Sequence, residues 1–415
     1  MFSPISTEKR IKAAVIFLFF SLFFSGCART RRREFQIWTI SLRPLFTDYM
    51  KHVIAQWEQK HPGIKVKWLD LPINAIQQKL IVGLASGDPP SIVNLNTDMA
   101  LQFKEMGVLE NLDQDVPPRI RKKYFPGFWK NFAVPWYVAP EILIYNRKIF
   151  KKAGLNPNKP PKTWKELIHD SVIIKQKTGL YGWFPAIKFL DELQEQGIPV
   201  ISPNKKKALF NNPEAVKWLN MYVQLLKKGD LPHEAILLGK AYQEAVDQYQ
   251  AGNLGILMTG PQFLERIKQN SETVYRETRV APLPLGKGNV YNAACMNLVI
   301  PKNAPLKQDA VSFLLFLTNQ ENQLKFCKKA LVFPSLINAA KSPFFTHTSR
   351  KSLTSQARSI GASELKYAKD LTLELPHKRD LNEAVQNAVI KALWGEESSQ
   401  TALNHAAKIW DRLLK

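Results

Sequence analysis

The chain has 415 residues, enough for two domains with sizeable cores. Its 45% hydrophobic and 22% charged residues are ordinary for a globular protein. The formal charge of +23 is unusual and favours anionic partners, such as nucleic acid, a lipid surface or an acidic ligand. The sequence has no zinc-knuckle spacing and no RNP-like aromatic motif, and its lysines are scattered, which argues against nucleic-acid binding. A solvated basic surface is the simplest interpretation of the charge.

The amino terminus has the pattern of an export signal. Three basic residues precede an apolar run at 13–24, which is too short for a bilayer span of about 20 residues. The run ends in Phe-Ser-Gly-Cys, which resembles the lipobox of bacterial lipoproteins. We therefore expect a signal peptide at 1–26, an acylated Cys27 and a basic tether at 27–34 that can face anionic head groups. The alternative is an ordinary signal peptide cleaved nearby, with Cys27 incidental.

Two cysteines remain in the body of the chain. Cys295 and Cys327 do not form a CxxC motif, so zinc or thioredoxin-like chemistry has no support. An exported location permits a disulfide between them, but their apolar surroundings are typical of buried free thiols. The sequence leaves both alternatives open.

The first part of the chain alternates between strand and helix patterns. Strands are predicted at 35–40, 64–69 and 91–95, and amphipathic helices at 45–60 and 75–85. This alternation predicts a mostly parallel sheet, in which ligands bind beyond the carboxyl ends of the strands.

That rule selects the residues after the first and third strands. Ser41 and Arg43 follow the first, and Asn96 and Asp98 follow the third. The guanidinium of Arg43 could pair with sugar hydroxyls, a carboxylate or a phosphate. Asn96 and Asp98 could equally cap the next helix.

The next stretch contains clear signals for where helices begin and end. An apolar run at 142–145 predicts a buried strand, and a short helix at 146–153 is stopped by Gly154. Thr163 and Glu166 form a capping box at the start of another helix. Further helices are expected at 215–228, 242–251 and 309–318, with a strand at 255–258 and two helices over 384–414 that divide near Gly395.

This order of elements resembles the first interdomain crossing of bacterial extracellular solute-binding proteins of the sugar-binding type, which feed ABC importers. The phrases HPGIKV, ASGDPPSIV and GVLENLD, and the loop Pro-Leu-Pro-Leu-Gly, resemble the same family, and the likeness runs from about Phe35 to Lys415. It implies an α/β, two-lobe periplasmic-binding-protein fold with a ligand in the cleft and a hinge near Glu141–Tyr145. Lobe I is expected at 35–140 plus 292–335, and lobe II at 141–291 plus 336–415.

Two departures from the family pattern bear on the ligand. Many sugar-binding relatives carry Trp after the Gly-Pro pair, where this chain has Gln262. Relatives often have Gly-Gly where Ala293 and Ala294 stand. The first departure removes a stacking platform and suggests a smaller or more polar ligand.

Sugar rings present apolar faces and hydroxyl edges, so a site needs flat aromatics with convergent polar groups. Aromatics near the two crossings and polar residues after strands meet this need. The predicted ligand-binding residues are Trp38, Ser41, Arg43, Asn96, Asp98, Trp136, Tyr137, Trp183, Gln262, Tyr291 and Asn292.

Catalytic and metal signatures are not found in the sequence. It has no nucleophile elbow, Walker loop, HExxH or EF-hand loop. The acid pairs Asp191–Glu192 and Glu396–Glu397 are interpreted as solvated residues of polar helices. We therefore expect no catalytic residue, metal or cofactor.

The resemblance implies a monomeric, lipid-anchored binding subunit of an ABC importer at the outer face of the bacterial cytoplasmic membrane. It would capture a sugar or glycoside by hinge closure and deliver it to a separate permease with its ATPase. Three alternatives stay open: a binder of an anionic ligand such as glycerol 3-phosphate or its diesters, an exported carbohydrate-active enzyme, and a sensory protein.

Overall fold

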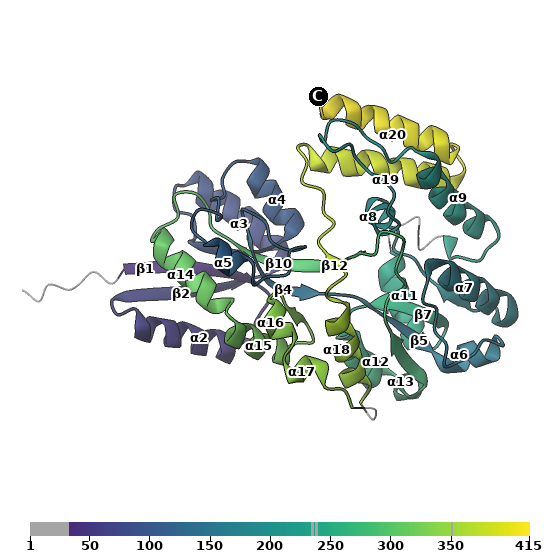
Figure 1. Ribbon diagram of the computed structural model, residues 1–415, viewed down its shortest axis with the longest axis horizontal. Coiled ribbons are helices and arrows are strands. Elements are labelled where there is room, and N and C mark those ends of the chain that lie inside the picture. Colours follow the sequence, from purple (N-terminus) through teal and green to yellow (C-terminus); the bar gives the residue numbers. More distant parts are fainter. Residues whose placement is uncertain (1–32, 234–235, 237–239, 350–351) are drawn as a thin grey trace, which may run out of the picture.

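The computed structural model describes residues 33–233, 236, 240–349 and 352–415. The predicted signal peptide, Cys27 and most of the tether lie outside the described residues. Two α/β bodies lie side by side, each built on its own sheet (Figure 1). We call them lobe I, on the left of that view, and lobe II.

Lobe I is built on a six-stranded sheet with the strand order β11-β4-β10-β3-β1-β2. β1 pairs in parallel with β2 and β3, whereas β10 runs antiparallel to β3 and β4, and β11 runs antiparallel to β4. The strands are β1 (Arg33–Ile40), β2 (Ile64–Leu71), β3 (Ile92–Asn96), β4 (Val134–Ala139), β10 (Ala294–Val299) and β11 (Phe333–Pro334).

The helices of lobe I present apolar faces to this sheet. Trp57 of α2 meets Phe35 of β1 and Phe313 of α14 edge to face, with ring centroids 5.7 and 5.5 Å apart. These large buried rings anchor the core of the lobe. The helices are α2 (Thr47–Lys60), α3 (Ile73–Ala85), α4 (Thr97–Glu105), α5 (Pro118–Arg121), α14 (Lys307–Leu317), α15 (Gln320–Lys329), α16 (Ile337–Ala340) and α17 (Pro343–Thr346).

Lobe II is built on a four-stranded sheet with the order β6-β7-β5-β8. β5 is antiparallel to both neighbours, and β6 is parallel to β7. The strands are β5 (Ile142–Asn146), β6 (Tyr181–Trp183), β7 (Leu254–Thr259) and β8 (Thr278–Ala281). The helices are α6 (Arg147–Lys152), α7 (Trp164–Thr178), α8 (Phe189–Glu195), α9 (Pro213–Lys227), α11 (Ala241–Gln250), α12 (Phe263–Asn270), α13 (Glu272–Glu277), α18 (Leu353–Glu364), α19 (Lys378–Trp394) and α20 (Ser399–Leu413).

Local signals in the sequence account for several helix ends. The hydroxyl of Thr163 accepts a hydrogen bond from the amide of Glu166, whose carboxylate accepts one from the amide of Thr163, so the predicted capping box is confirmed. Gly395 ends α19 with a φ of +77°, a conformation that glycine adopts without strain. The predicted division of the tail into two helices is therefore confirmed.

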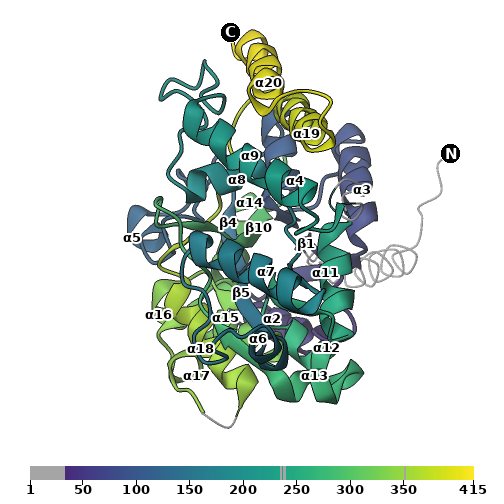
Figure 2. The ribbon, with the colours of Figure 1, turned by 90° about the vertical axis from the view of Figure 1, so that its right-hand side faces the viewer.

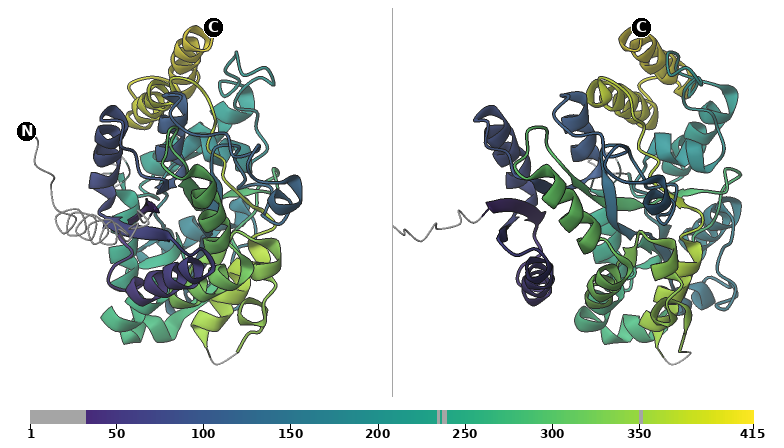
Figure 3. Two further views of the ribbon diagram at one scale, coloured as in Figure 1. Left: turned by 90° about the vertical axis from the view of Figure 1, so that its left-hand side faces the viewer. Right: turned by 60° about the vertical axis from the view of Figure 1, so that its left-hand side comes forward.

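The C-terminal helix pair is part of lobe II. α19 packs against α8, α9 and α20. Figure 2 shows α19 and α20 together at one end of the molecule, and both views of Figure 3 place them on the same end.

Three segments lie at the junction of the lobes. The first joins β4 of lobe I to β5 of lobe II, and the second runs from lobe II through β9 (Tyr291–Asn292) into β10. The third lies between α18 and α19 of lobe II and contains β12 (Ala368–Lys369), which pairs in parallel with β9. We call residues 368–378 the third crossing.

Two expectations differ from the structure. The sheets are mixed rather than mostly parallel, because in lobe I β10 enters from the second crossing and runs antiparallel to both β3 and β4. Lobe I also continues beyond residue 335, since α16 packs against β11 and α15.

Cys295 and Cys327 are both free and buried. Burial raises the pKa of each thiol above its usual range. The structure therefore favours buried thiols over the disulfide alternative.

Candidate functional site

A cavity of about 330 Å³ lies where α8 meets the first two crossings. It takes Glu141 from the first crossing and Asn292 from the second. Lobe II supplies the remaining walls. They are Trp164 of α7, Trp183 of β6, Phe184, Ala186 and Lys188 of the following loop, Asp191, Glu192 and Glu195 of α8, Tyr242 and Ala245 of α11, and Leu257 and Met258 of β7. We call this space the hinge cavity.

Two predicted ligand residues line the hinge cavity. The buried ring of Trp183 meets Trp164 edge to face, at 5.7 Å between centroids. Asn292 donates a hydrogen bond from Nδ2 to Asp191 at 2.7 Å, and its amide donates to Glu195 at 2.9 Å. Its side-chain oxygen accepts from the amide of Leu371 at 3.1 Å. Asn292 therefore holds α8 and the third crossing against β9.

The cavity is acidic, and its acids resist ionisation. Burial raises the pKa of Asp191 to about 6 and that of Glu195 to about 8, and neighbouring carboxylates add to both shifts. Burial also raises the pKa of Glu141, partly offset by the charge of Lys188. Strained acids of this kind in a cavity are typical of functional sites.

Glu192 has a structural role in the wall of the cavity. Its carboxylate accepts hydrogen bonds from Trp218 Nε1 at 2.9 Å and Tyr222 Oη at 3.0 Å, which attach α8 to α9. Burial raises its pKa to about 7. The interpretation of Asp191 and Glu192 as solvated is therefore wrong: Glu192 is 6% exposed, and Asp191 lines the cavity.

The three aromatic residues of lobe I that are predicted to contact ligand pack against other side chains of the lobe, and their role as ligand contacts stays a prediction. Trp136 is fully buried, and both it and Tyr137 pack against Phe326 of α15, at 4.8 and 4.9 Å between centroids. Burial raises the pKa of Tyr137. Trp38 is buried in a second cluster with Ile76 and Leu80 of α3. Trp136 and Tyr137 are consecutive in β4, and both rings reach Phe326 where the pairing of β4 with β10 shifts register around Trp136.

The side chains of three of the four polar candidates of lobe I have a partner among the described residues, and for Asp98 that partner lies in lobe II. Asn96 caps α4 by accepting from the amide of Met99 at 2.9 Å, so its capping alternative holds. The guanidinium of Arg43 lies 4.4 Å from the ring centroid of Trp68. Exposed Ser41 lies beside it in a positive-φ turn. Asp98 forms an ion pair with Lys378 of α19.

Gln262 and Tyr291 differ in accessibility. Gln262 is exposed beside Gly260, and Phe263 after it meets Tyr242 edge to face at 6.0 Å. Tyr291 is buried, and its hydroxyl has no hydrogen-bond partner among the described residues. The nearby charges of Glu364, Glu141 and Glu195 add to the effect of burial and raise its pKa.

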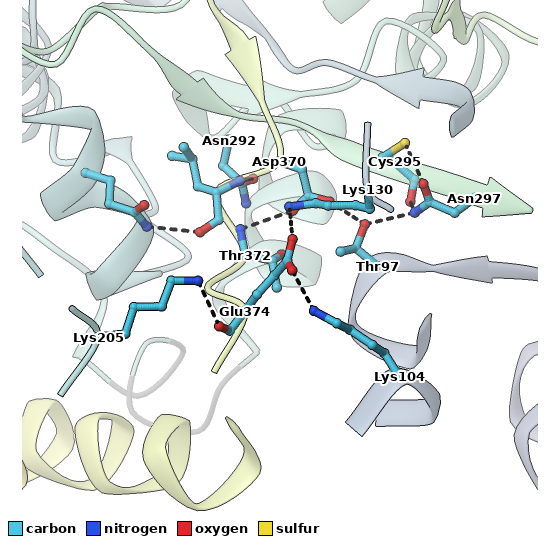
Figure 4. Close-up of polar contacts among 12 residues, drawn as sticks. Thr97, Lys104, Lys130, Lys205, Asn292, Cys295, Asn297, Asp370, Thr372 and Glu374 are labelled. Carbon is cyan, nitrogen blue, oxygen red and sulfur yellow. Dashed lines mark hydrogen bonds and ion pairs between the residues drawn. The ribbon is translucent and has the colours of Figure 1, made fainter. Parts of the chain in front are cut away.

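The third crossing is bound on both sides by polar contacts (Figure 4). Glu374 pairs with Lys104 at 2.9 Å and Lys130 at 3.0 Å, both in lobe I. Burial opposes ionisation of Glu374, but the two lysines outweigh it and hold the pKa below its usual range. On the other side, Lys205 of lobe II donates to the carbonyl of Glu374 at 3.4 Å.

The acids of the hinge cavity carry no distinctive sequence signal. Glu141 follows a proline at the crossing, and Asp191 and Glu195 lie on one face of a short helix with four-residue spacing. That spacing is a weak signal, because surface helices carry it too. Their burial depends on β9, which lies 101 residues after Asp191.

Comparisons with known proteins agree with this architecture. Residues 43–324 match the model of the bacterial extracellular solute-binding protein family, and the chain belongs to that family. A candidate oligosaccharide periplasmic-binding protein from Synechococcus sp. MITs9220 is 28% identical with a TM-score of 0.81, covering 92% of this chain and 98% of the other.

Two further relatives have different ligands in their names. The cyclic alpha-maltosyl-1,6-maltose binding protein of Arthrobacter globiformis has a TM-score of 0.78 at 19% identity, covering 92% of this chain and 99% of the other. The sn-glycerol-3-phosphate-binding periplasmic protein of Shigella flexneri is 24% identical over 387 residues, which is 82% of this chain and 83% of the relative.

The described residues give two further results. They contain no group of three or more His, Cys, Asp or Glu side chains placed to hold a metal ion. Of the helices in the described ranges, none combines the length and the apolar character that a membrane span requires.

Proposed function

We propose that this chain is the substrate-binding subunit of an ABC importer and captures a neutral sugar or glycoside in the hinge cavity. The single observation that carries the proposal is the cavity itself, which combines carboxylates with aromatic side chains at the junction of the lobes. Carboxylates accept hydrogen bonds from hydroxyl groups, and Trp183 and Tyr242 offer apolar surface to a sugar ring.

The acids also bear on the anionic alternative. A phosphate ester in the hinge cavity would face Glu141, Asp191 and Glu195, with Lys188 as the opposing charge in the described wall. A further anion beside these acids would raise their pKa values still more and is unfavourable in a buried site. Arg43, which motivated an anionic ligand, rests on Trp68 instead. A neutral polyol ligand is therefore the better fit than glycerol 3-phosphate or its diesters.

Capture would proceed by closure of the lobes around the ligand. Asp98 of lobe I adds to the raised pKa of Asp191 in lobe II, so the two carboxylates sense each other across the junction. Hydroxyl donors between these acids would relieve that repulsion and favour the closed population. The ligand is then released to a permease with its ATPase, and the chain acts as a monomer without catalysis of its own.

The chain would be held at the membrane by lipid on Cys27. The twelve-residue apolar segment and Phe-Ser-Gly-Cys support this anchor, and the arginines that follow supply a second membrane signal.

A thermal-shift screen tests the proposal. The sample is the chain from residue 27 with Cys27→Ser, which contains every described element. The ligands are mono- and disaccharides, methyl glycosides and glycerol phosphates. A ligand at 100 times its dissociation constant adds about 2.7 kcal/mol of stability. Shifts with neutral sugars or glycosides are expected, and shifts with phosphates alone would overturn the assignment.

A further inference from the structure

A second cavity of about 450 Å³ lies between the start of α8, the start of α11 and α19. Apolar side chains predominate among its described lining residues. Ile187, Phe189 and Leu190 form the wall next to α8. We call this space the outer compartment.

One face of α19 forms the opposite wall. The lining residues of this helix are Asn382, Val385, Gln386, Val389, Ile390 and Leu393. Their spacing of three and four residues places them on a single helical face. The aliphatic members lie toward the carboxyl-terminal half of the face, with the two amides nearer its start.

The outer compartment adjoins the hinge cavity. Ala186, Lys188, Asp191 and Tyr242 line both spaces. Tyr242 is fixed at this junction by a hydrogen bond of 2.8 Å between its hydroxyl and that of Thr259. A ligand seated against Asp191 in the hinge cavity therefore lies next to the outer compartment, with the side chains of Asp191 and Tyr242 at the boundary between the two spaces.

The two spaces have different chemistry. The hinge cavity has two tryptophans and four acids with raised pKa values, which suit a polar ring. In the described wall of the outer compartment no tryptophan is present, and its floor is aliphatic. An aliphatic ligand chain binds favourably against aliphatic walls because apolar surface is removed from water. Hydroxyl groups in the same place would lose their hydrogen bonds to water without gaining new partners.

From this contrast and from the shared wall of the two spaces we propose that the outer compartment is a second subsite, which receives an aliphatic chain carried by the ligand. The substrate class is then a glycoside with an apolar aglycone rather than a free sugar. This inference rests on the proposed function, because the polar head of the ligand must occupy the hinge cavity.

The burial of a chain has a measurable signature. Each methylene buried in an apolar site contributes about 0.8 kcal/mol, which is about a fourfold gain in affinity. The heat-capacity change of binding also becomes more negative with each added methylene.

Titration calorimetry with a homologous series tests the proposal. The probes are methyl, butyl and hexyl β-D-glucosides and the corresponding maltosides, all kept below micelle-forming concentrations, with the chain from residue 27 carrying Cys27→Ser. The expected result is an affinity that rises from methyl to hexyl, by about fourfold for each methylene that enters the compartment. Equal affinities for methyl and hexyl glycosides would overturn the inference and leave the proposed function standing.

A matched pair of variants locates the effect. Ile390→Asn places an amide in the aliphatic wall and should remove most of the chain-length gain while leaving methyl glycoside affinity unchanged. Trp394→Asn lies one turn further along the helix, outside the described lining, and should retain the gain. If Ile390→Asn does not fold, Ile187→Asn in the opposite wall serves the same purpose.

Other outcomes separate the two proposals. If maltotetraose gains affinity over maltose, and Ile390→Asn removes that gain instead, the compartment is a sugar subsite and the aliphatic assignment is wrong. If no glycoside of the series binds and the free sugars also fail in the thermal-shift screen, the proposed function fails and the inference fails with it.

Discussion

The strand ends of lobe I and the α8 region of lobe II both gather polar side chains near the junction, but they differ in how those side chains are satisfied. Asn96 caps its own helix, and Arg43 lies on Trp68. On α8, Asp191 and Glu195 have fewer partners than their burial demands, so their pKa values are raised. This difference indicates which polar residues form a binding site. Buried polar groups with too few partners mark the site, whereas a position after a strand is also typical of residues that only cap a helix or stabilise a turn.

The largest expected effect tests whether the aromatic approach to the first crossing is core. Trp136→Ala should lower the free energy of unfolding by about 3–5 kcal/mol, because a fully buried ring leaves a cavity. Urea denaturation measures the loss. The folded fraction should bind its sugar with unchanged affinity, and a stable variant with weakened binding would show that the ring faces the ligand.

Asn292→Ala tests the link between α8 and the crossings. The change removes the side-chain bonds to Asp191 and Leu371, so both segments lose their fixed position at the cavity. We expect the affinity for the sugar to fall by about 10- to 100-fold, corresponding to about 1.4–2.7 kcal/mol. Calorimetry provides the measurement, and Asn253→Ala, outside the described lining of the cavity, is the matched control.

Glu195→Gln tests the strain of the acidic cavity through its pH dependence. The folded protein holds a proton on Glu195 up to a pKa of about 8, whereas the ordinary value is 4.5. Between those values the folded state binds more protons than the unfolded state, so stability falls as the pH rises. The variant keeps an acceptor for the Asn292 amide and should flatten that fall by about 1–2 kcal/mol, after allowance for solvent screening.

Thermal unfolding of wild type and Glu195→Gln from pH 4.5 to 8.5 gives the comparison. Identical slopes would show that Glu195 ionises freely and that the cavity stores no electrostatic strain.

The smallest effect concerns the capping residue of lobe I. Asn96→Ala removes the bond to the amide of Met99 and should cost about 1 kcal/mol of stability. Sugar affinity should stay within twofold of wild type. A large loss of affinity with no loss of stability would return Asn96 to the ligand site.

Much of the architecture follows from local sequence signals. The capping box at Thr163, the buried strand after Glu141 and the division at Gly395 depend on neighbouring residues alone, and each is present. Strand direction is not a local property, so the mixed sheets could not be predicted from alternation of helix and strand.

The site follows less well because it depends on distant packing. The sequence predicts Trp183 and Asn292 as ligand contacts, and both line the hinge cavity. Contact with a ligand stays a prediction for each. Asp191 is an ordinary helical acid until β9 and the third crossing cover α8. The aromatic pattern predicts Trp136 as a ligand contact. A strand residue can face either the core or the cleft, however, and only the fold decides between them.

The most direct test is calorimetric titration of one neutral sugar or glycoside from the screen against Asp191→Asn and Arg43→Ala. If the acidic hinge cavity holds the ligand, Asp191→Asn should lower the affinity by tenfold or more, and Arg43→Ala should leave it within twofold of wild type. The reverse result, with Arg43→Ala abolishing binding and Asp191→Asn neutral, would contradict the account and return the site to the strand ends of lobe I.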